Sequence, residues 1–530
     1  MGSKAGFRVP QPPPPPPPAA SPRVTHHHYP QPQTSFPGPV FSEEWARPNE
    51  DSYFRGNYFW FHAYSASYKT LAGGFSRNPR GSWVGSSAFR VFRRPESARA
   101  GEQVEAVAYT DYGDGDDDED DENQGLDFPG GKVAFTPQMK FISESLEKKV
   151  PCYRVLDDDG YIIPGSTFER VDKSTAVRMY RSMVTLQIMD SFFYEAQRQG
   201  RLSFYMTSTG EEAVNIATAA ALSSDDVVLP QYREPGILLW RGFTLEQFTN
   251  QLFGTKYGSD KGRQMPVHYG SKQHNYLTVS SPIATQLPQA AGVAYSLKMD
   301  NKEACVVAFM GDGCTSEGDF HAGLNFAAVM EAPVIFVCRN NGYAISTPTS
   351  EQFRSIVSTP TSEQFRSDGV VVKGQAYGIR SIRVDGNDTL AVYSAIRVAR
   401  EMTIREHKPV LVEALTYRVG HHSTSDDSTK YRPSNEIDHW KTARNPTNRF
   451  RKWVQRNGWW TDEDENELRS STRKQVLSAI HEAGKIEKPS LEELFTDVYD
   501  RVPSNLHEQE KSLREFVVKN KQDYPVDVPL

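Results

Sequence analysis

The stretch "CVVAFMGDGCTSEGDFHAGLNFAAVMEAPVIFVCRNNGYAIS", Cys305–Ser346, contains the pattern that decides the fold. An apolar run of strand length, Cys305–Phe309, precedes a glycine-flanked aspartate, and a helical segment, Glu317–Val329, precedes a second apolar run, Val334–Cys338. Short, wholly apolar strands that alternate with helices are typical of a parallel sheet with both faces covered. This stretch therefore predicts an α/β fold.

The same alternation continues on both sides of that stretch. Helical spacing of apolar residues predicts a helix from Asp172 to Gly200, and the apolar letters "VVLP" predict a strand at Val227–Pro230. Further predicted elements are the helices Gly210–Leu222, Ser281–Met299 and Thr389–Glu406 and the strands Ser381–Val384 and Val410–Thr416. We predict that residues 126–434 form a doubly wound parallel sheet with helices on both faces, which binds ligands at the carboxyl ends of its strands.

The C-terminal part of the chain, residues 435–530, is charged and has a helical pattern. We expect a helical C-terminal region that packs on the body of the protein. The residues expected to make this contact are the tryptophans Trp453, Trp459 and Trp460.

Residues 1–125 predict a disordered leader. The first 42 residues contain no acid and include a proline tract, Pro12–Pro18. A second acid-free stretch, Ser52–Pro95, combines arginine with serine, glycine and aromatic residues, which is typical of an organellar transit segment. Because transit segments begin at the N-terminus, either the upstream residues are a mis-predicted extension or the composition is a coincidence. The like-charged block Asp114–Gly125 predicts a solvated acidic linker.

The composition of the whole chain narrows the choice of ligands. With 60 basic and 67 acidic residues among 530, the formal charge is −7, which does not favour a nucleic-acid partner. No apolar run approaches the roughly 18 residues of a membrane-spanning helix. The four cysteines are scattered without a CxxC pair, so we expect reduced, structural thiols and no zinc site. Small molecules and protein partners remain as the candidate ligands.

A tandem repeat interrupts the chain after the opening stretch. The letters "STPTSEQFRS" occur at Ser346–Ser355 and again at Ser358–Ser367, a period of twelve residues. Two copies of this length do not make a repeat fold. We predict a local duplication, genuine or arising from the gene prediction, that lengthens one loop as a solvent bulge and leaves the neighbouring site intact.

Polar residues follow both strands of the opening stretch. Gly311, Asp312 and Gly313 follow the first strand, and Asn341 follows the second. Because such loops lie side by side at one edge of a parallel sheet, we expect Asp312 and Asn341 to converge. Carboxylate and amide oxygens suit Mg²⁺, whose remaining ligands can be phosphate oxygens. The glycines allow close backbone approach, and the following helix offers amide donors to a phosphate.

With an acidic helix start, an intervening strand and a downstream Asn-Asn pair, the Gly-Asp-Gly turn resembles the thiamin diphosphate motif. The chain from Leu126 to Leu530 resembles the alpha subunit of the decarboxylating component of 2-oxo acid dehydrogenases. This resemblance implies the cofactors thiamin diphosphate, Mg²⁺ and K⁺. It also implies that Mg²⁺ is bound by Asp312, Asn341 and the main-chain oxygen of Tyr343.

Two further segments carry the resemblance. "QYREPG", Gln231–Gly236, matches the diphosphate clamp, so Tyr232 and Arg233 are expected to contact the cofactor. Arg339 is placed for a phosphate or for the metal loop, the loop that carries Asn341. "SSPIATQ", Ser280–Gln286, would by itself be an ordinary helix start. The resemblance implies that Ser281 and Ile283 touch the aminopyrimidine side, and that K⁺ is bound by Ser280, Pro282, Thr285 and Gln286.

The loop "YRVGHHSTSDDSTKYR", Tyr417–Arg432, contains a histidine pair, which alone is more often a solvated turn than a catalyst. Beside a phosphate site it is a candidate for proton handling. The resemblance implies that His422 is catalytic and lies at the cofactor, and that Ser423 is a regulatory phosphorylation site. A second such site of the animal relatives falls on Pro433. The letters "HHSTSDD" resemble the branched-chain members of the family rather than the pyruvate members.

The resemblance also implies a reaction and its partners. Branched-chain 2-oxo acids would be decarboxylated and their acyl group passed to the lipoyl group of a transacylase core in the mitochondrial matrix, under kinase and phosphatase control. One regular α/β region supplies only the diphosphate half, so a beta subunit in an alpha2beta2 heterotetramer would provide the activating glutamate. Two alternative functions stay open: the alpha subunit of a pyruvate or acetoin dehydrogenase, and a non-catalytic assembly subunit. The expected walls of the substrate pocket are Glu195, Phe204 and Tyr232.

Overall fold

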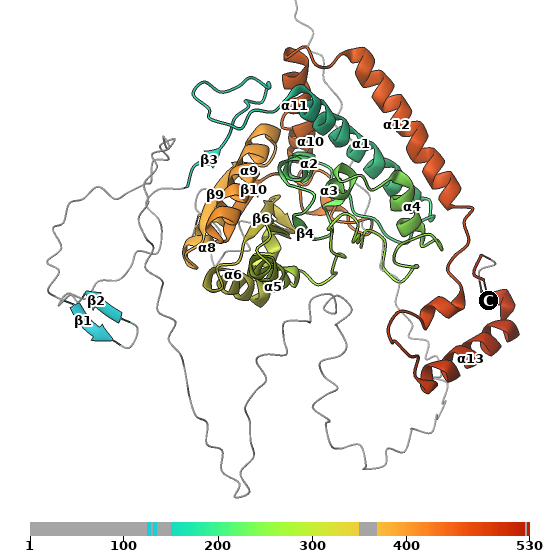
Figure 1. Ribbon diagram of the computed structural model, residues 1–530. Helices are drawn as coiled ribbons and strands as arrows, with labels where there is room; N and C mark the ends of the chain where they lie inside the picture. Colours follow the sequence, from blue (N-terminus) through green and yellow to red (C-terminus); the bar gives the residue numbers. More distant parts are fainter. Residues whose placement is uncertain (1–124, 129–130, 135–149, 349–367, 525–526, 530) are drawn as a thin grey trace, which may run out of the picture. The chain divides into compact units, whose positions relative to one another are not determined.

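The computed structural model describes residues 125–128, 131–134, 150–348, 368–524 and 527–529 (Figure 1). The predicted leader, the transit segment, the acidic linker up to residue 124 and most of the duplicated loop lie outside these residues. Strands β1 (Gly125–Phe128) and β2 (Gly131–Ala134) pair as an antiparallel hairpin. A second short hairpin joins β7 (Tyr343–Ala344) to β8 (Thr347–Pro348), where the duplication begins.

The centre of the fold is a six-stranded sheet in the order β3-β9-β10-β6-β5-β4. All neighbouring strands in it are parallel, as predicted. The strands are β3 (Cys152–Tyr153), β4 (Val227–Leu229), β5 (Val306–Gly311), β6 (Val334–Asn340), β9 (Arg380–Asp385) and β10 (Val410–Leu415). The edge strand β3 was not predicted, because two residues are too few to form a recognisable pattern.

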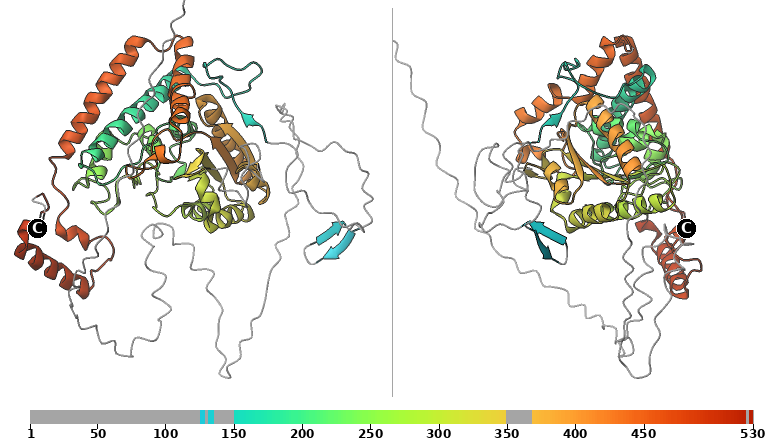
Figure 2. Two further views of the ribbon diagram at one scale, coloured as in Figure 1. Left: turned by 180° about the vertical axis from the view of Figure 1, so that it is seen from behind. Right: turned by 60° about the vertical axis from the view of Figure 1, so that its left-hand side comes forward.

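Helices cover both faces of this sheet, which confirms the predicted fold class (Figure 1, Figure 2). Alternate residues of β5 belong to different cores: Val307 and Phe309 pack in one, and Val306 and Met310 in the other. The first core contains α1 (Lys173–Arg198), α2 (Glu212–Ala221) and α9 (Thr389–Glu406). The second contains α5 (Gln286–Met299) and α6 (Gly318–Val329).

Local sequence explains where the helices near the strand ends begin. The predicted helix from Gly210 starts later, at Glu212. Gly210 has a φ of +98°, outside the helical range, and a Cβ there would lie 2.2 Å from the main-chain oxygen of Tyr417. A 3-10 turn, Asp312–Ser316, separates β5 from α6. The backbone amides next to Gly313 therefore belong to this turn, and the predicted helix follows as α6.

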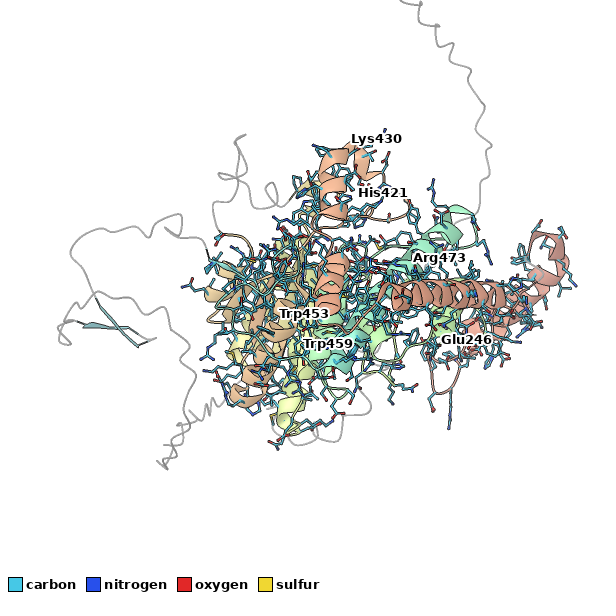
Figure 3. The ribbon with its side chains drawn as sticks, turned by 90° about the horizontal axis from the view of Figure 1, so that it is seen from above. Glu246, His421, Lys430, Trp453, Trp459 and Arg473 are labelled. Carbon is cyan, nitrogen blue, oxygen red and sulfur yellow. The ribbon has the colours of Figure 1, made fainter. Side chains whose placement is uncertain are left out.

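The C-terminal part contains α10 (Ser434–Thr442), α11 (Pro446–Arg456), α12 (Asp462–Ala483) and α13 (Ser504–Lys519). Trp453 and Trp460 are buried in the first core, and Figure 3 shows Trp453 beside the half-buried Trp459. On α12, Glu465 accepts hydrogen bonds from Tyr180 Oη of α1 (2.7 Å) and Trp460 Nε1 (3.0 Å). The bond from Tyr180 joins α12 to α1, and the two helices lie side by side (Figure 1).

Three shorter helices complete the regular elements near the sheet: α3 (Pro235–Trp240), α4 (Leu245–Phe253) and α8 (Val371–Gln375). Helix α3 follows the loop after β4 and has Pro235 in its first turn, where the missing N–H costs no hydrogen bond. In the described part of the chain, no helix combines the length and the apolar character needed to cross a membrane.

Candidate functional site

The two polar loops of the opening stretch lie at one edge of the sheet. Strands β5 and β6 are neighbours, with Gly311 opposite Arg339, so Asp312 and Asn341 leave adjacent strands at nearly the same level. Both side chains are buried. A Cβ on Gly313 would lie 2.9 Å from the Cβ of Ala344, which shows how closely the two loops pack. The two loops are therefore neighbours, while the convergence of the Asp312 and Asn341 side chains stays a prediction.

A buried glutamate, Glu211, connects Asn341 to Arg339. Asn341 Nδ2 donates to Glu211 Oε1 (2.7 Å), and Arg339 Nη1 donates to Glu211 Oε2 (2.5 Å). Arg339 forms a second ion pair with Glu234, which is also fully buried. Two carboxylates thus neutralise Arg339. Of the two roles predicted for it, its contacts favour support of the metal loop over binding of a phosphate.

The predicted clamp residues, Tyr232 and Arg233, contact the loop Tyr417–Arg432, which we call the histidine loop. Arg233 follows β4. It donates from Nη1 to the main-chain oxygen of Thr207 (2.6 Å) and from Nη2 to the main-chain oxygen of His422 (2.5 Å). Tyr232 Oη lies 3.4 Å from His422 Nε2. His422, which is far from Tyr232 and Arg233 in sequence, therefore lies beside both of them.

The segment before α2 holds Arg233 from the other side. Asp190 of α1 accepts hydrogen bonds from Tyr205 Oη (2.8 Å) and from the Ser208 amide (2.6 Å) and hydroxyl (2.8 Å). Burial raises the pKa of this carboxyl to about 6, although these hydrogen bonds oppose the shift. Asp190 thereby fixes the backbone around Thr207, whose oxygen binds Arg233.

Three arginines around the histidine loop differ from Arg339 in their hydrogen-bond partners. Arg233, Arg418 and Arg432 are each at most 2% exposed, and within the described ranges none of them forms an ion pair with a carboxylate. Their hydrogen bonds go to backbone oxygens and, from Arg418, to Tyr431 Oη. Buried charge without a counter-charge is unfavourable. A diphosphate is an anion of suitable charge and geometry, so these residues fit a diphosphate-bearing cofactor.

His422 lies within this positive environment. Burial, and to a lesser extent the neighbouring Arg233 and Arg418, lower the pKa of its imidazole to about 3, against a smaller opposite effect of Asp426. The ring is therefore neutral at physiological pH. A neutral imidazole can accept a proton at one nitrogen while it donates from the other.

The segment Ser280–Gln286 forms a compact loop before α5. Thr285 Oγ1 lies 3.2 Å from Ser280 Oγ and 3.1 Å from the Pro282 oxygen, so three of the four predicted K⁺ ligands are together. The fourth, Gln286, donates its amide to the Phe309 oxygen of β5 (2.7 Å). Two further residues were predicted at the aminopyrimidine side: Ser281, whose hydroxyl lies 2.5 Å from His268 Nε2, and Ile283, which packs against the second core.

Other predicted residues lie further from these contacts. Glu195 is exposed on α1, and no hydrogen bond or ion pair among the described residues joins it to Phe204 or Tyr232. Both of these aromatic residues are half-buried against the first core. Ser423 is buried, and its hydroxyl accepts a hydrogen bond from the Ser425 amide (3.2 Å). Pro433 caps α10.

The candidate metal site offers a mixed set of oxygen ligands. Among the described residues, no three His, Cys, Asp or Glu side chains are grouped to hold a metal ion. One carboxylate, one amide oxygen and a main-chain oxygen would suit a hard cation that keeps other ligands from phosphate and water. Asp312, Asn341 and Tyr343 provide these three types of oxygen, so the residues present fit Mg²⁺.

Sequence reasoning missed several residues that build the site. Glu211 and Glu234 attracted no functional interpretation, although Glu234 directly follows the predicted clamp residue Arg233 in the letters "QYREPG". Arg418 and Arg432 flank the histidine pair within the quoted loop and were not assigned a role. The signal available for the two arginines was their position within a loop expected at a phosphate site.

Fold and site together define a class: an α/β protein with buried arginines at the carboxyl edge of a parallel sheet, the edge where such folds bind ligands. Residues 180–492 match the family described as "Dehydrogenase E1 component", and the chain belongs to this family. The family is thiamin diphosphate-dependent. Its histidine loop, at which Figure 3 labels His421 and Lys430, lies within the matched residues.

Relatives with curated names agree with this assignment. The chain is 70% identical over 402 residues to "2-oxoisovalerate dehydrogenase subunit alpha 1, mitochondrial" of Arabidopsis thaliana, covering 76% of this chain and 83% of the relative. It is 65% identical over 408 residues to the alpha 2 protein of the same plant, covering 77% and 84%. It is 46% identical over 400 residues to "2-oxoisovalerate dehydrogenase subunit alpha, mitochondrial" of Homo sapiens, covering 76% and 87%.

Proposed function

We propose that the chain is the alpha subunit of a branched-chain 2-oxo acid dehydrogenase, 3-methyl-2-oxobutanoate dehydrogenase (2-methylpropanoyl-transferring). The observation that carries this proposal is the set of buried, unpaired guanidinium groups of Arg233, Arg418 and Arg432 at the sheet edge where Asp312 and Asn341 emerge. The names of relatives at 46–70% identity support the substrate class. The enzyme works in the mitochondrial matrix in branched-chain amino acid catabolism.

Cofactor binding divides between a cation site and an anion site. Asp312, Asn341 and the main-chain oxygen of Tyr343 would hold Mg²⁺, and Tyr232 and Arg233 would bind the diphosphate. Gly311 and Gly313 keep the backbone of the first loop free of side chains, so that it can approach the phosphates. Thiamin diphosphate, when bound, supplies a nucleophilic carbon that can add to a keto group and stabilise the charge left by decarboxylation.

Other residues of the chain orient the cofactor and handle protons. His422, neutral and in contact with Tyr232, is suited to hold a proton at Nε2 near the reacting centre. Ser281 and Ile283 would contact the aminopyrimidine side, and K⁺ bound by Ser280, Pro282, Thr285 and Gln286 would hold that loop in place. The walls for a branched side chain would be Glu195, Phe204 and Tyr232.

The site needs other proteins to be complete. A beta subunit is the partner of an E1 alpha subunit and would supply the carboxylate that activates the cofactor, in an alpha2beta2 heterotetramer. The acyl group would pass to the lipoyl group of a transacylase core. Phosphorylation of Ser423 by a regulatory kinase, reversed by a phosphatase, would place a dianion beside the arginines that bind the diphosphate, and would thus compete with the cofactor.

The test is a reconstitution of the chain with its beta subunit. Decarboxylation of 3-methyl-2-oxobutanoate should exceed decarboxylation of pyruvate, and the chain alone should be inactive. A preference for pyruvate would contradict the substrate class. Calorimetry with thiamin diphosphate and Mg²⁺ on the same complex separates a catalytic subunit from an assembly subunit, because a subunit that does not bind the cofactor gives no binding heat.

A further inference from the structure

Glu211 makes contacts that a purely structural carboxylate does not need. It lies just before α2, is fully buried, and each of its two oxygens accepts a hydrogen bond from a different donor. Oε2 accepts from the guanidinium of Arg339 (2.5 Å), and Oε1 accepts from the amide nitrogen of Asn341 (2.7 Å). The two donors come from the end of β6 and the residue just after it, far from Glu211 in sequence.

The contact with Asn341 determines which end of its amide faces the loops. Only the oxygen of an asparagine can bind a metal ion, whereas its NH₂ group repels one. An ionised carboxylate can only accept hydrogen bonds, so Glu211 holds the nitrogen on its own side and leaves the oxygen on the other. The backbone N–H of Tyr343 donates to Asn341 Oδ1 (3.2 Å), which agrees with the same orientation.

We propose that Glu211 is a positioning residue for the metal ion: it keeps the amide oxygen of Asn341 directed to Mg²⁺ without touching the metal itself. This inference rests on the proposed function, in which Asn341 is a Mg²⁺ ligand. Residues in contact with metal ligands commonly change metal affinity by about 10- to 100-fold when they are substituted.

The role requires a glutamate with two acceptor oxygens. In a Glu211→Gln variant the side chain has one acceptor, for which Arg339 and Asn341 compete. The charged guanidinium is the stronger donor and takes it. The new NH₂ group then faces Asn341, whose amide turns its oxygen toward Gln and its nitrogen toward the metal site. The variant should therefore lose affinity for Mg²⁺ rather than lose its fold.

The chain offers a matched control in Glu234. This residue is equally buried and forms the other ion pair with Arg339, but it has no contact with Asn341 and instead accepts from the Gln231 amide (2.7 Å). Glu234→Gln is the same substitution with the same loss of charge beside the same arginine. A difference between the two variants in Mg²⁺ affinity therefore reports on Asn341.

The experiment titrates Mg²⁺ into the alpha–beta complex by calorimetry at a fixed, saturating concentration of thiamin diphosphate, and measures the melting temperature of the cofactor-free complex. Glu211→Gln should weaken Mg²⁺ binding by about tenfold or more. Glu234→Gln should lower the melting temperature by a similar amount and leave Mg²⁺ affinity unchanged. Equal Mg²⁺ affinities for the two variants would overturn the proposal.

A swap provides the second test and guards against a variant that does not assemble. In Glu211→Gln combined with Asn341→Asp, the NH₂ of the new glutamine donates to the new aspartate, whose second oxygen is free for Mg²⁺. The double variant should bind Mg²⁺ more tightly than either Glu211→Gln or Asn341→Asp alone. If it binds no better than Asn341→Asp, the proposal is wrong. Absence of Mg²⁺ and cofactor binding in the unchanged complex would instead refute the proposed function.

Discussion

Arg339 and Arg233 lie in one site and are almost equally buried, at 1% and 2% exposed, but their electrostatic surroundings are opposite. Arg339 is paired with two carboxylates, those of Glu211 and Glu234. Arg233, like Arg418 and Arg432 near it, has only neutral oxygens as partners among the described residues. Arg339 is held by direct ion pairs, whereas Arg233 and Arg418 interact with carboxylates only at longer range, Arg233 with Asp190 and Arg418 with Glu211 and Asp426.

This difference separates a structural role from a binding role better than burial or residue type does. A buried arginine with its counter-charges already in place has little left to offer an anion, and its removal leaves unpaired carboxylates. A buried arginine without a counter-charge is tolerated in the fold because a ligand later supplies one. Stability should therefore depend on Arg339, and cofactor affinity on Arg233.

The largest expected effect is that of Arg339→Met. The substitution leaves Glu211 and Glu234 buried without their cation, and breaking a buried ion pair in this way typically costs about 3–5 kcal/mol. The cofactor-free alpha–beta complex should melt at a much lower temperature, or fail to assemble. Differential scanning calorimetry and size-exclusion chromatography measure these outcomes.

The control for this prediction removes the carboxylates together with the arginine. In Arg339→Met combined with Glu211→Gln and Glu234→Gln, no unpaired charge remains, so much of the lost stability should return. A triple variant that is as unstable as Arg339→Met would mean that packing, and not charge balance, explains the effect.

Arg233→Met should have a smaller effect, and on a different quantity. The loss of a charged hydrogen-bond donor to a diphosphate is expected to cost about 1.5–3 kcal/mol of binding free energy, or roughly 10- to 150-fold in affinity. The melting temperature of the cofactor-free complex should change far less than in Arg339→Met, because no carboxylate loses its partner. Calorimetric titration with thiamin diphosphate at saturating Mg²⁺ gives the affinity.

Arg233→Lys tests whether charge or geometry matters at this position. Lysine keeps the positive charge but cannot donate simultaneously to the Thr207 and His422 oxygens and to a phosphate as a planar fork does. The affinity of Arg233→Lys for thiamin diphosphate should lie between those of the unchanged chain and Arg233→Met. If Arg233→Met binds the cofactor as tightly as the unchanged chain, the binding role assigned to the unpaired arginines is wrong.

The strands of the sheet could be predicted because each is a short apolar run buried on both faces. Cys305–Phe309 and Val334–Cys338 correspond to β5 and β6, which extend the predicted runs by two residues into the polar loops. The edge strand β3 could not be predicted, since its two residues pair with β9 more than 200 positions away. The start of α2 was placed too early because the close contact between Gly210 and Tyr417 is long-range.

The candidate site divides along the same line. Asp312, Asn341 and Tyr232 stand in local motifs, so their neighbourhood could be inferred from strand order and from a family resemblance. The charge balance of the site could not be inferred in this way, because it depends on which acidic side chain contacts which arginine across the fold. Glu211 lies 128 positions before Arg339 in the sequence, and only the folded chain shows that they pair.

His422 provides the smallest expected effect and a direct test of the surplus charge. Its pKa is lowered from 6.5 to about 3 by burial and then by Arg233 and Arg418. A folded-state pKa below the unfolded value contributes stability that is present above pH 6.5 and is lost as the pH falls from 6.5 toward 3. A bound diphosphate would offset the charge of the two arginines and raise the pKa of His422 again.

Cofactor binding should therefore be accompanied by partial proton uptake at His422 between its lowered pKa of about 3 and its ordinary pKa of 6.5, and His422→Gln should abolish that uptake. The number of protons is obtained from binding enthalpies measured in two buffers with different enthalpies of ionisation. The diphosphate itself exchanges protons near this pH in both proteins, so the quantity that matters is the difference between them. Equal proton uptake in the two proteins would mean that the cofactor does not change the field at His422. The surplus charge of Arg233 and Arg418 would then be balanced by something other than the diphosphate.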